Sequence, residues 1–159
     1  KFVFCLDTAE LEQGLQKLFY QNQWTKIYCS EGGLKALLPP NNLHDDIASC
    51  DASVTSCESL VARTGSILLS SAQQGRIPSV YAPVHICVAY TSQLVYDIKD
   101  GLERIKQKYG DAIPSMISLA TGPSRTADIE KTLVVGVHGP KEVYCFVVDD
   151  GPLSPGGGT

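Results

Sequence analysis

The chain has 159 residues, 43% of them hydrophobic and 19% charged, which is the size and composition of one globular domain and not of a disordered segment. Its formal net charge is −4 and its basic residues are scattered singly, so it lacks the basic stripe that binding to a nucleic acid backbone requires. The sequence shows neither an apolar run of about 20 residues nor an export signal, so we expect a cytoplasmic protein whose partners include neither a membrane nor a nucleic acid.

The first third of the chain alternates between strand and helix patterns. An apolar strand is predicted immediately, at residues 2–6, which indicates that part of the native N-terminus is missing. Asp7 has the position of an N-cap, and apolar residues at helical spacing then predict a helix over residues 8–22. A short strand at residues 26–29 and a helical segment at 34–38 follow. This alternation is typical of a parallel sheet.

The rest of the chain is richer in strand patterns. Further strands are predicted at residues 59–62, 66–70, 83–90, 116–120 and 143–148. Between the third and fourth of these, Ser92 is the predicted N-cap of a second helix, and Gly110 is its predicted C-terminal glycine. Residues 1–150 are therefore expected to form one domain, and residues 151–159, mostly Gly, Pro and Ser, a loose tail.

The six cysteines lie far apart along the chain, at positions 5, 29, 50, 57, 87 and 145. None belongs to a Cys-x-x-Cys pair, whereas iron–sulfur and structural zinc sites usually have clustered ligands. A disulfide framework is typical of small secreted chains. We therefore expect reduced and mostly buried thiols, with no bound metal and no cofactor.

The most informative segment is residues 121–130 together with residues 133–142. It contains Gly-Pro-Ser-Arg-Thr-Ala-Asp-Ile-Glu, and then Gly-Val-His-Gly-Pro. Upstream lie Ala-Arg-Thr-Gly-Ser at residues 62–66 and Pro-Val-His at residues 83–85. Together these motifs resemble the LUD domain family, and within it the bacterial lactate utilization protein C branch. The resemblance is specific over residues 50–148.

The resemblance implies a three-layer α/β/α open sheet similar to that of the NagB/RpiA/CoA-transferase superfamily. It also implies a role beside two iron–sulfur partner proteins that together oxidise L-lactate to pyruvate. Because this chain lacks cluster-binding cysteines, we expect it to be the cluster-free accessory subunit. Arg63 stands where the family usually has Glu and where related CoA transferases place a nucleophile. A guanidinium cannot act as a carboxylate nucleophile, so we expect no covalent CoA-transferase chemistry at this position unless nearby Glu58 has taken over that role.

Three loops, the turn at residues 64–66, the turn at residues 124–126 and the loop around His138, are expected to meet at one rim of the sheet and to form a pocket for a small anionic ligand. Backbone N–H groups and side chains there can hold a carboxylate or phosphate. The candidate ligand-binding residues are Arg63, Thr64, Gly65, Ser66, Gly122, Pro123, Ser124, Arg125, Thr126, Asp128, Glu130 and Gly139. A purely structural interpretation also fits: Ser124 or Thr126 caps a helix, and Asp128 and Glu130 complement its dipole.

The charged and titratable residues of these loops each have a functional and a structural interpretation. Arg63, Arg76 and Arg125 either form a cationic pocket or are scattered surface residues. His138, between glycines, is a candidate acid or base, as is Glu58, although a histidine that ties its loop together fits equally well.

His85 and Cys87 share one strand face and are interpreted as core residues. Three functions remain: the accessory subunit, an enzyme acting alone on a small carboxylated or phosphorylated metabolite, and an interaction module.

Overall fold

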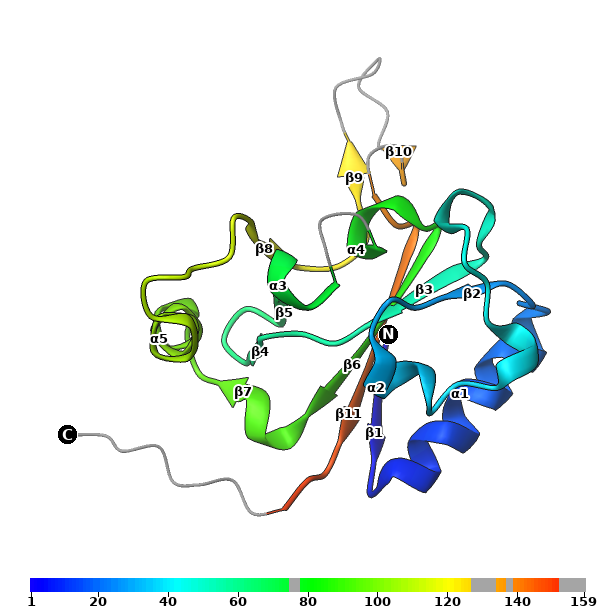
Figure 1. Ribbon diagram of the computed structural model, residues 1–159, viewed down its shortest axis with the longest axis horizontal. Helices are drawn as coiled ribbons and strands as arrows, with labels where there is room; N and C mark the ends of the chain where they lie inside the picture. The colour runs from blue at the N-terminus through cyan, green and yellow to red at the C-terminus, as the bar shows by residue number, and fades with distance from the viewer. Residues whose placement is uncertain (75–77, 127–133, 137–138, 152–159) are drawn as a thin grey trace.

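The computed structural model describes residues 1–74, 78–126, 134–136 and 139–151 and has a five-stranded parallel sheet at its centre (Figure 1). In spatial order its strands are β1 (Phe2–Cys5), β11 (Glu142–Val148), β6 (Val84–Tyr90), β3 (Ala52–Thr55) and β2 (Ile27–Tyr28). Each neighbouring pair is parallel. The two longest strands, β6 and β11, lie inside the sheet, which explains their nearly continuous apolar sequences.

A second sheet of four strands packs beside the first. Its order is β7 (Leu94–Val95), β4 (Ser59–Val61), β5 (Ser66–Ser70) and β8 (Ile117–Ala120). β4 and β5 form an antiparallel hairpin, and β8 pairs antiparallel with β5. A separate antiparallel pair consists of β9 (Arg125–Thr126) and β10 (Val134–Val135).

The helices differ greatly in length. The two long ones are α1 (Thr8–Asn22) and α5 (Ile98–Tyr109). The short helices are α2 (Gly32–Lys35), α3 (Ser71–Gln74) and α4 (Pro78–Tyr81), and 3₁₀ turns cover Pro40–Asn42, Ile47–Ser49 and Thr91–Gln93. Over the described ranges, no helix combines the length and apolar character needed to cross a bilayer.

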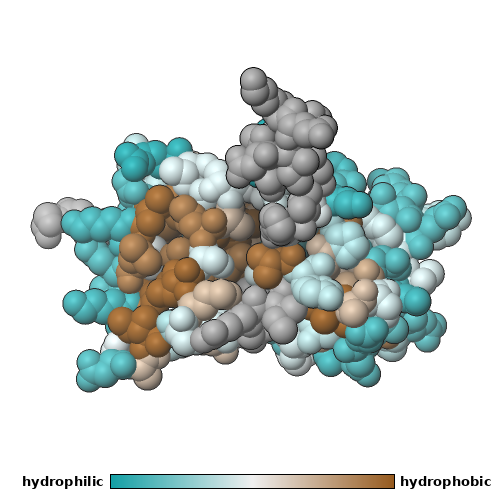
Figure 2. Space-filling view, turned by 90° about the horizontal axis from the view of Figure 1, so that it is seen from above, coloured by the Kyte–Doolittle hydropathy of each residue, from teal (hydrophilic) through white to brown (hydrophobic). Residues whose placement is uncertain are grey.

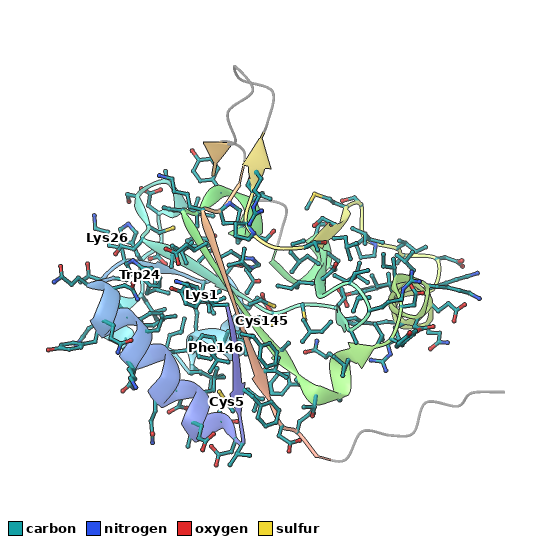
Figure 3. All side chains as sticks on the ribbon, turned by 180° about the vertical axis from the view of Figure 1, so that it is seen from behind. Lys1, Cys5, Trp24, Lys26, Cys145 and Phe146 are labelled. Carbon is teal, nitrogen blue, oxygen red and sulfur yellow. The ribbon has the colours of Figure 1, made fainter. Side chains whose placement is uncertain are left out.

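The first face of the parallel sheet is covered by α1 and α2. Leu11 and Leu15 of α1 pack with Ile86 and Phe146 in one buried cluster, and Figure 3 shows Phe146 on the α1 side of the sheet. Gly14 permits this close approach, because a Cβ atom there would lie 3.0 Å from the Phe146 ring.

The opposite face of the parallel sheet packs against the second sheet. Cys87 and Val147 from the parallel sheet share a buried cluster with Leu60 and Ile67 from the second sheet. α5 lies beyond the second sheet, and Figure 1 shows α1 and α5 on opposite sides of the molecule. The predicted α/β fold, a parallel sheet flanked by helices, is confirmed.

One part of the second sheet remains open to the surface. Figure 2 shows apolar residues gathered on the half of the upper face that lies over β8 and α5 in Figure 1. Leu119 of β8 is 40% exposed, and Ile113, which precedes β8, is 51% exposed. The edge strand β8 is therefore less deeply buried than β4 and β5, which are buried throughout.

The local signals of the first helix predicted its bounds correctly. The Asp7 carboxylate accepts a hydrogen bond from the Glu10 backbone N–H at 2.8 Å, and the Glu10 carboxylate accepts one from the Leu6 N–H, also at 2.8 Å. Both bonds satisfy backbone donors at the start of the helix, as capping requires.

The predicted start of the second helix is wrong. Asp97, and not Ser92, is the N-cap of α5, and its carboxylate accepts a bond from the Ile98 N–H at 2.6 Å. Ser92 instead lies in a 3₁₀ turn and donates its hydroxyl to Asp150. The predicted end is correct, since Gly110 has a φ of 55°.

Candidate functional site

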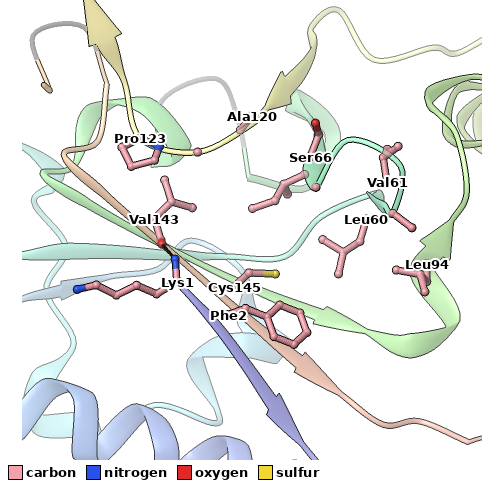
Figure 4. Close-up of a pocket in the computed structure, with 14 residues that line it drawn as sticks. Lys1, Phe2, Leu60, Val61, Ser66, Leu94, Ala120, Pro123, Val143 and Cys145 are labelled. Atoms are coloured by element: carbon pink, nitrogen blue, oxygen red, sulfur yellow. Dashed lines mark hydrogen bonds between the residues drawn. The ribbon is translucent and has the colours of Figure 1, made fainter. Parts of the chain in front are cut away.

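A cavity of about 490 Å³ lies between the two sheets (Figure 4). Phe2 and Cys145 line it from the parallel sheet, while Leu60 and Leu94 line it from the second sheet. Most of these groups are apolar, so this larger cavity suits an apolar group better than a small charged one.

Two candidate segments meet at the rim of this larger cavity. Gly65 and Ser66, from the hairpin turn, line it together with Gly122 and Pro123. The Ser66 hydroxyl lies 2.8 Å from the hydroxyl of Thr121. The pairing of β5 with β8 therefore brings the turn at residues 64–66 to the segment at residues 121–123, as the prediction of a shared pocket requires.

A smaller cavity of about 230 Å³ adjoins the larger one, and both are lined by Ala120, Gly122 and Val143. The lining of the smaller cavity is more polar. Its polar side chains are those of Ser79, His85, Ser118, Thr121 and Ser124. The volume of this cavity is thus below the about 300–1,000 Å³ typical of pockets for drug-sized molecules.

Backbone hydrogen bonds hold Ser124 beside Gly136 and Pro140, and Pro140 lines the smaller cavity together with Gly139. The Ser124 N–H donates to the Pro140 carbonyl at 2.9 Å, and the Gly136 N–H donates to the Ser124 carbonyl at 3.0 Å. Gly139 lies so close that a Cβ atom there would be 3.0 Å from the Cβ of Ser124. The Gly-Pro-Ser motif and the Gly-Pro part of the second motif are thus in direct contact.

His85 lies on β6, on the sheet face that packs against the second sheet, and its side chain lines the smaller cavity. The residue is only 1% exposed. Its Nε2 lies 2.8 Å from the Thr55 hydroxyl, whereas its Nδ1 has no hydrogen-bond partner among the described residues. Desolvation by burial lowers the pKa of His85 to about 4, so the imidazole is neutral at pH 7.

Of the predicted arginines, Arg63 and Arg125 lie within the described ranges, and neither lines either cavity. The guanidinium of Arg63 is 3.1 Å from the carboxylate of Asp97, and its side chain is exposed. Arg125 is exposed and pairs with Val135. Arg125 and Thr126 form strand β9, and the helix that the structural interpretation expects after them falls on residues outside the described ranges.

Some candidate residues lie outside the described residues. These are Arg76, Asp128, Glu130 and His138. Most of the predicted tail, residues 152–159, also lies outside them.

The sequence profile of the LUD domain matches residues 6–148 of this chain, which is most of its length. The chain belongs to the LUD domain family. Lactate utilization protein C of Bacillus licheniformis is 43% identical over 100 residues, covering 61% of this chain and 42% of that protein. Lactate utilization protein C of a Geobacillus species is 31% identical over 148 residues, covering 87% of this chain and 58% of that protein. The chain thus spans about half the length of these curated relatives.

The fold is also that of a solved structure. A DUF162 family protein from Deinococcus radiodurans superposes with a TM-score of 0.66, covering 92% of this chain and 87% of that one. Its sequence identity is 24%, so the similarity concerns the fold of the LUD domain alone.

Glu58 of this LUD domain is held by three hydrogen-bond donors. Its carboxylate accepts bonds from Ser70, from Lys108 at 2.9 Å and from Tyr109 at 2.8 Å. Burial raises the pKa of Glu58, but these bonds outweigh the burial and leave the pKa lowered. Glu58 lines neither cavity, and its contacts attach α5 to the second sheet.

All six cysteines of the LUD domain are free, as predicted, and five of them are buried. The exception is Cys145, which is partly exposed and lines the larger cavity. Within the described ranges, no group of three or more His, Cys, Asp or Glu side chains has an arrangement that could hold a metal ion.

Ser79, Ser118 and His85 were not among the predicted site residues. Ser79 lies in α4 and Ser118 in β8, and neither belongs to a sequence motif that indicates a binding site. His85 had a signal, because it is part of the Pro-Val-His motif, but its position on an apolar strand indicated a core residue. It is buried as that interpretation requires, and it also lines the smaller cavity.

Proposed function

We propose that this LUD domain serves an L-lactate oxidation system as a cluster-free accessory subunit that binds a small anion and works with iron–sulfur proteins. The observation that carries this proposal is the family match over residues 6–148, together with relatives named Lactate utilization protein C at 31–43% identity. All three loops of the candidate site fall within the matched range.

The geometry of the smaller cavity supports the ligand-binding part of the proposal. The hydroxyl groups of Ser118, Thr121 and Ser124 line it, and hydroxyl groups are good hydrogen-bond donors to a carboxylate. The cavity volume of about 230 Å³ is sufficient for a small metabolite, such as a three-carbon acid.

A second candidate function is catalysis by this chain alone on a small carboxylated metabolite. The observation that favours it is His85, since a strongly perturbed pKa beside a cavity is typical of functional sites. Glu58 is a poor candidate for the acid or base, because its carboxylate already has three donors.

Deleting the gene in the organism that encodes the chain tests the proposal. We expect growth on L-lactate as sole carbon source to fail or slow, growth on glucose to stay normal, and a plasmid copy to restore growth on lactate. Normal growth on lactate would contradict the proposal.

Affinity purification then separates the two candidates. An accessory subunit is expected to be recovered with iron–sulfur proteins and to support lactate oxidation only in their presence. An enzyme is expected to turn over its substrate when purified alone.

A further inference from the structure

Three of the six thiols lie together where the parallel sheet packs against the second sheet. Cys145 of β11 is paired in register with Cys87 of β6, so their side chains are neighbours on the same face of the sheet. Hydrogen bonds join the Cys87 thiol to the thiols of Cys145 and Cys57. Cys57 and Cys87 are fully buried, whereas Cys145 is partly exposed. The cluster therefore has one thiol that a reagent can reach and two that are closed off from solvent.

The accessible thiol of this cluster opens onto the larger cavity. Cys145 lines that cavity, and in Figure 4 its sulfur atom points from the strand toward Leu60 of the second sheet. Phe2 is the partner of Cys145 on the β1 side, and it lines the same cavity. Since most of the lining is apolar, a reagent that reaches Cys145 through this cavity is favoured when it carries an apolar group.

The paired thiols are spaced as a disulfide requires. Neighbouring strands of a sheet lie about 4.8 Å apart, and the Cα atoms of disulfide-bonded cysteines are usually about 4.4–6.8 Å apart. Cys145 and Cys87 are direct partners across β11 and β6. A bond between them is therefore compatible with the spacing of the two strands as they stand.

The two thiols also differ in acidity. The hydrogen bond that Cys87 donates to Cys145 lowers the pKa of Cys145, although burial opposes this shift. The same bond, together with burial, raises the pKa of Cys87. Because the thiolate is the reacting form of cysteine, Cys145 has the character of a nucleophile and Cys87 keeps its proton.

We propose that Cys145 is an oxidation site for organic hydroperoxides that enter the larger cavity, and that Cys87 then closes a disulfide with it. This site is separate from the smaller cavity, and it does not depend on the proposed function.

Two balanced steps describe the reaction. The Cys145 sulfur attacks the terminal oxygen of the hydroperoxide, so an S–O bond forms, the O–O bond breaks, and the thiol proton leaves with the organic alcohol. The sulfur is oxidised to a sulfenic acid, and the peroxide is reduced. The Cys87 sulfur then attacks the sulfenic sulfur, so an S–S bond forms and the hydroxyl group leaves as water with the Cys87 proton.

Peptide mass spectrometry tests this inference on the whole reduced chain. The chain is treated briefly with one equivalent of cumene hydroperoxide, quenched in acid, and digested with trypsin after the remaining thiols are blocked. We expect one disulfide, linking residues 77–99 to residues 142–159. Each of these tryptic peptides contains a single cysteine, Cys87 and Cys145 respectively, so the link identifies the pair.

Cysteine variants separate the two steps. In Cys87→Ala the second thiol is missing, so we expect the sulfenic acid to persist on Cys145, where dimedone traps it. In Cys145→Ala the accessible thiol is missing, so we expect the other thiols to be oxidised at least about tenfold more slowly. Cys5 is buried on the α1 side of the same sheet, and Cys5→Ala is the control that is expected to form the same disulfide as the unaltered chain.

A comparison of two peroxides tests the part played by the cavity. Cumene hydroperoxide has an apolar body, which hydrogen peroxide lacks. We expect the ratio of their rates to be at least about fivefold higher for disulfide formation in the chain than for oxidation of free cysteine. Leu94→Gln places a polar group in the lining and is expected to lower this ratio. Leu102→Gln, similarly exposed on α5 but not part of the lining, is expected to leave it unchanged.

The inference is overturned if the first disulfide joins another pair, if dimedone finds no sulfenic acid on Cys145 in Cys87→Ala, or if the peroxide ratio equals that of free cysteine. Should the variants fail to fold, the disulfide map and the peroxide ratio of the unaltered chain still decide. None of these results depends on growth on lactate, so the proposed function stands or falls separately.

Discussion

The side-chain hydroxyl of Ser66 lies 2.8 Å from that of Thr121, although 55 positions separate the two residues along the chain. The Thr64 hydroxyl lies 2.8 Å from Ser66 on the other side. Ser66 is 1% exposed, so its hydroxyl is the buried centre of a chain of three hydroxyl groups. This chain joins the hairpin turn to the segment after β8, and Ser66 lines the larger cavity while Thr121 lines the smaller one.

Replacing Ser66 tests the importance of this junction for stability. Ser66→Ala leaves the Thr64 and Thr121 hydroxyls without their shared partner, so we expect the free energy of unfolding to fall by about 1–2 kcal/mol. Urea denaturation followed by circular dichroism measures it. Ser30→Ala, at an exposed position, is the control and is expected to stay within about 0.5 kcal/mol of the unaltered chain. Equal stability of the two variants would show that the junction contributes little.

Replacing Glu58 distinguishes a structural role from a catalytic one. Glu58→Gln removes the charge that Ser70, Lys108 and Tyr109 surround, so we expect a loss of about 2–3 kcal/mol in the free energy of unfolding and unchanged lactate affinity. Lys106→Ala, at an exposed position of the same helix, is expected to change neither quantity. A stable Glu58→Gln variant that no longer supports lactate oxidation would instead place Glu58 in the chemistry.

His85 gives the stability of the chain a predictable dependence on pH. Its pKa is about 4 in the folded chain against an ordinary value of 6.5, and desolvation is the cause. Between these values the unfolded chain binds more protons than the folded chain. The free energy of unfolding is therefore expected to fall by on the order of 3 kcal/mol as the pH drops from 6.5 to about 4. Above pH 6.5 His85 is neutral in both states and adds nothing to the pH dependence.

Urea denaturation at several pH values within this window provides the measurement. His85→Asn has no titrating group there, so its stability is expected to fall less steeply with pH, whatever its absolute stability. Glu58 has a lowered pKa and loses its contribution only at the acidic end of the window. Identical slopes for the variant and the unaltered chain would contradict the assignment of this slope to His85.

Cys145 is expected to be the most reactive thiol. It is the one partly exposed cysteine, and a hydrogen bond with Cys87 lowers its pKa although burial opposes this shift. Iodoacetamide is expected to alkylate Cys145 at least about tenfold faster than the other thiols in the folded chain, because the thiolate is the reacting form. Mass spectrometry of peptides identifies the site. A first adduct on another cysteine, or an equally fast first alkylation of Cys145→Ser, would contradict the prediction.

Elements set by local signals were predicted well, and those set by distant contacts were not. The first helix followed from its cap and its apolar spacing, both of which lie within the helix itself. Ser92 and Asp97 are both good caps, and Asp150 decided between them by accepting the Ser92 hydroxyl from 58 positions away.

Strand β3 was not predicted from the sequence, because half of its residues are polar. Ala52–Thr55 is buried throughout, yet Ser53 and Thr55 give it a weak strand pattern. The Ser53 hydroxyl donates to the Pro78 carbonyl at 2.6 Å, and the Thr55 hydroxyl pairs with His85. Burial is tolerable because both groups have partners, and those partners come from other parts of the chain.

The candidate site was predictable to a similar extent. The motifs indicated that the turn at residues 64–66 meets the segment containing Ser124, and the strand pairing of β5 with β8 explains how they meet. The role of His85 was not predictable, because period-two spacing gives the same pattern for a core residue and for a residue beside a cavity.

A crystal structure of the chain grown with saturating L-lactate tests the central claim most directly. The prediction is electron density for one lactate in the smaller cavity, with a carboxylate oxygen within about 3.2 Å of the Ser124 hydroxyl. An empty smaller cavity, or lactate bound beside Arg125 or in the larger cavity instead, would contradict the claim.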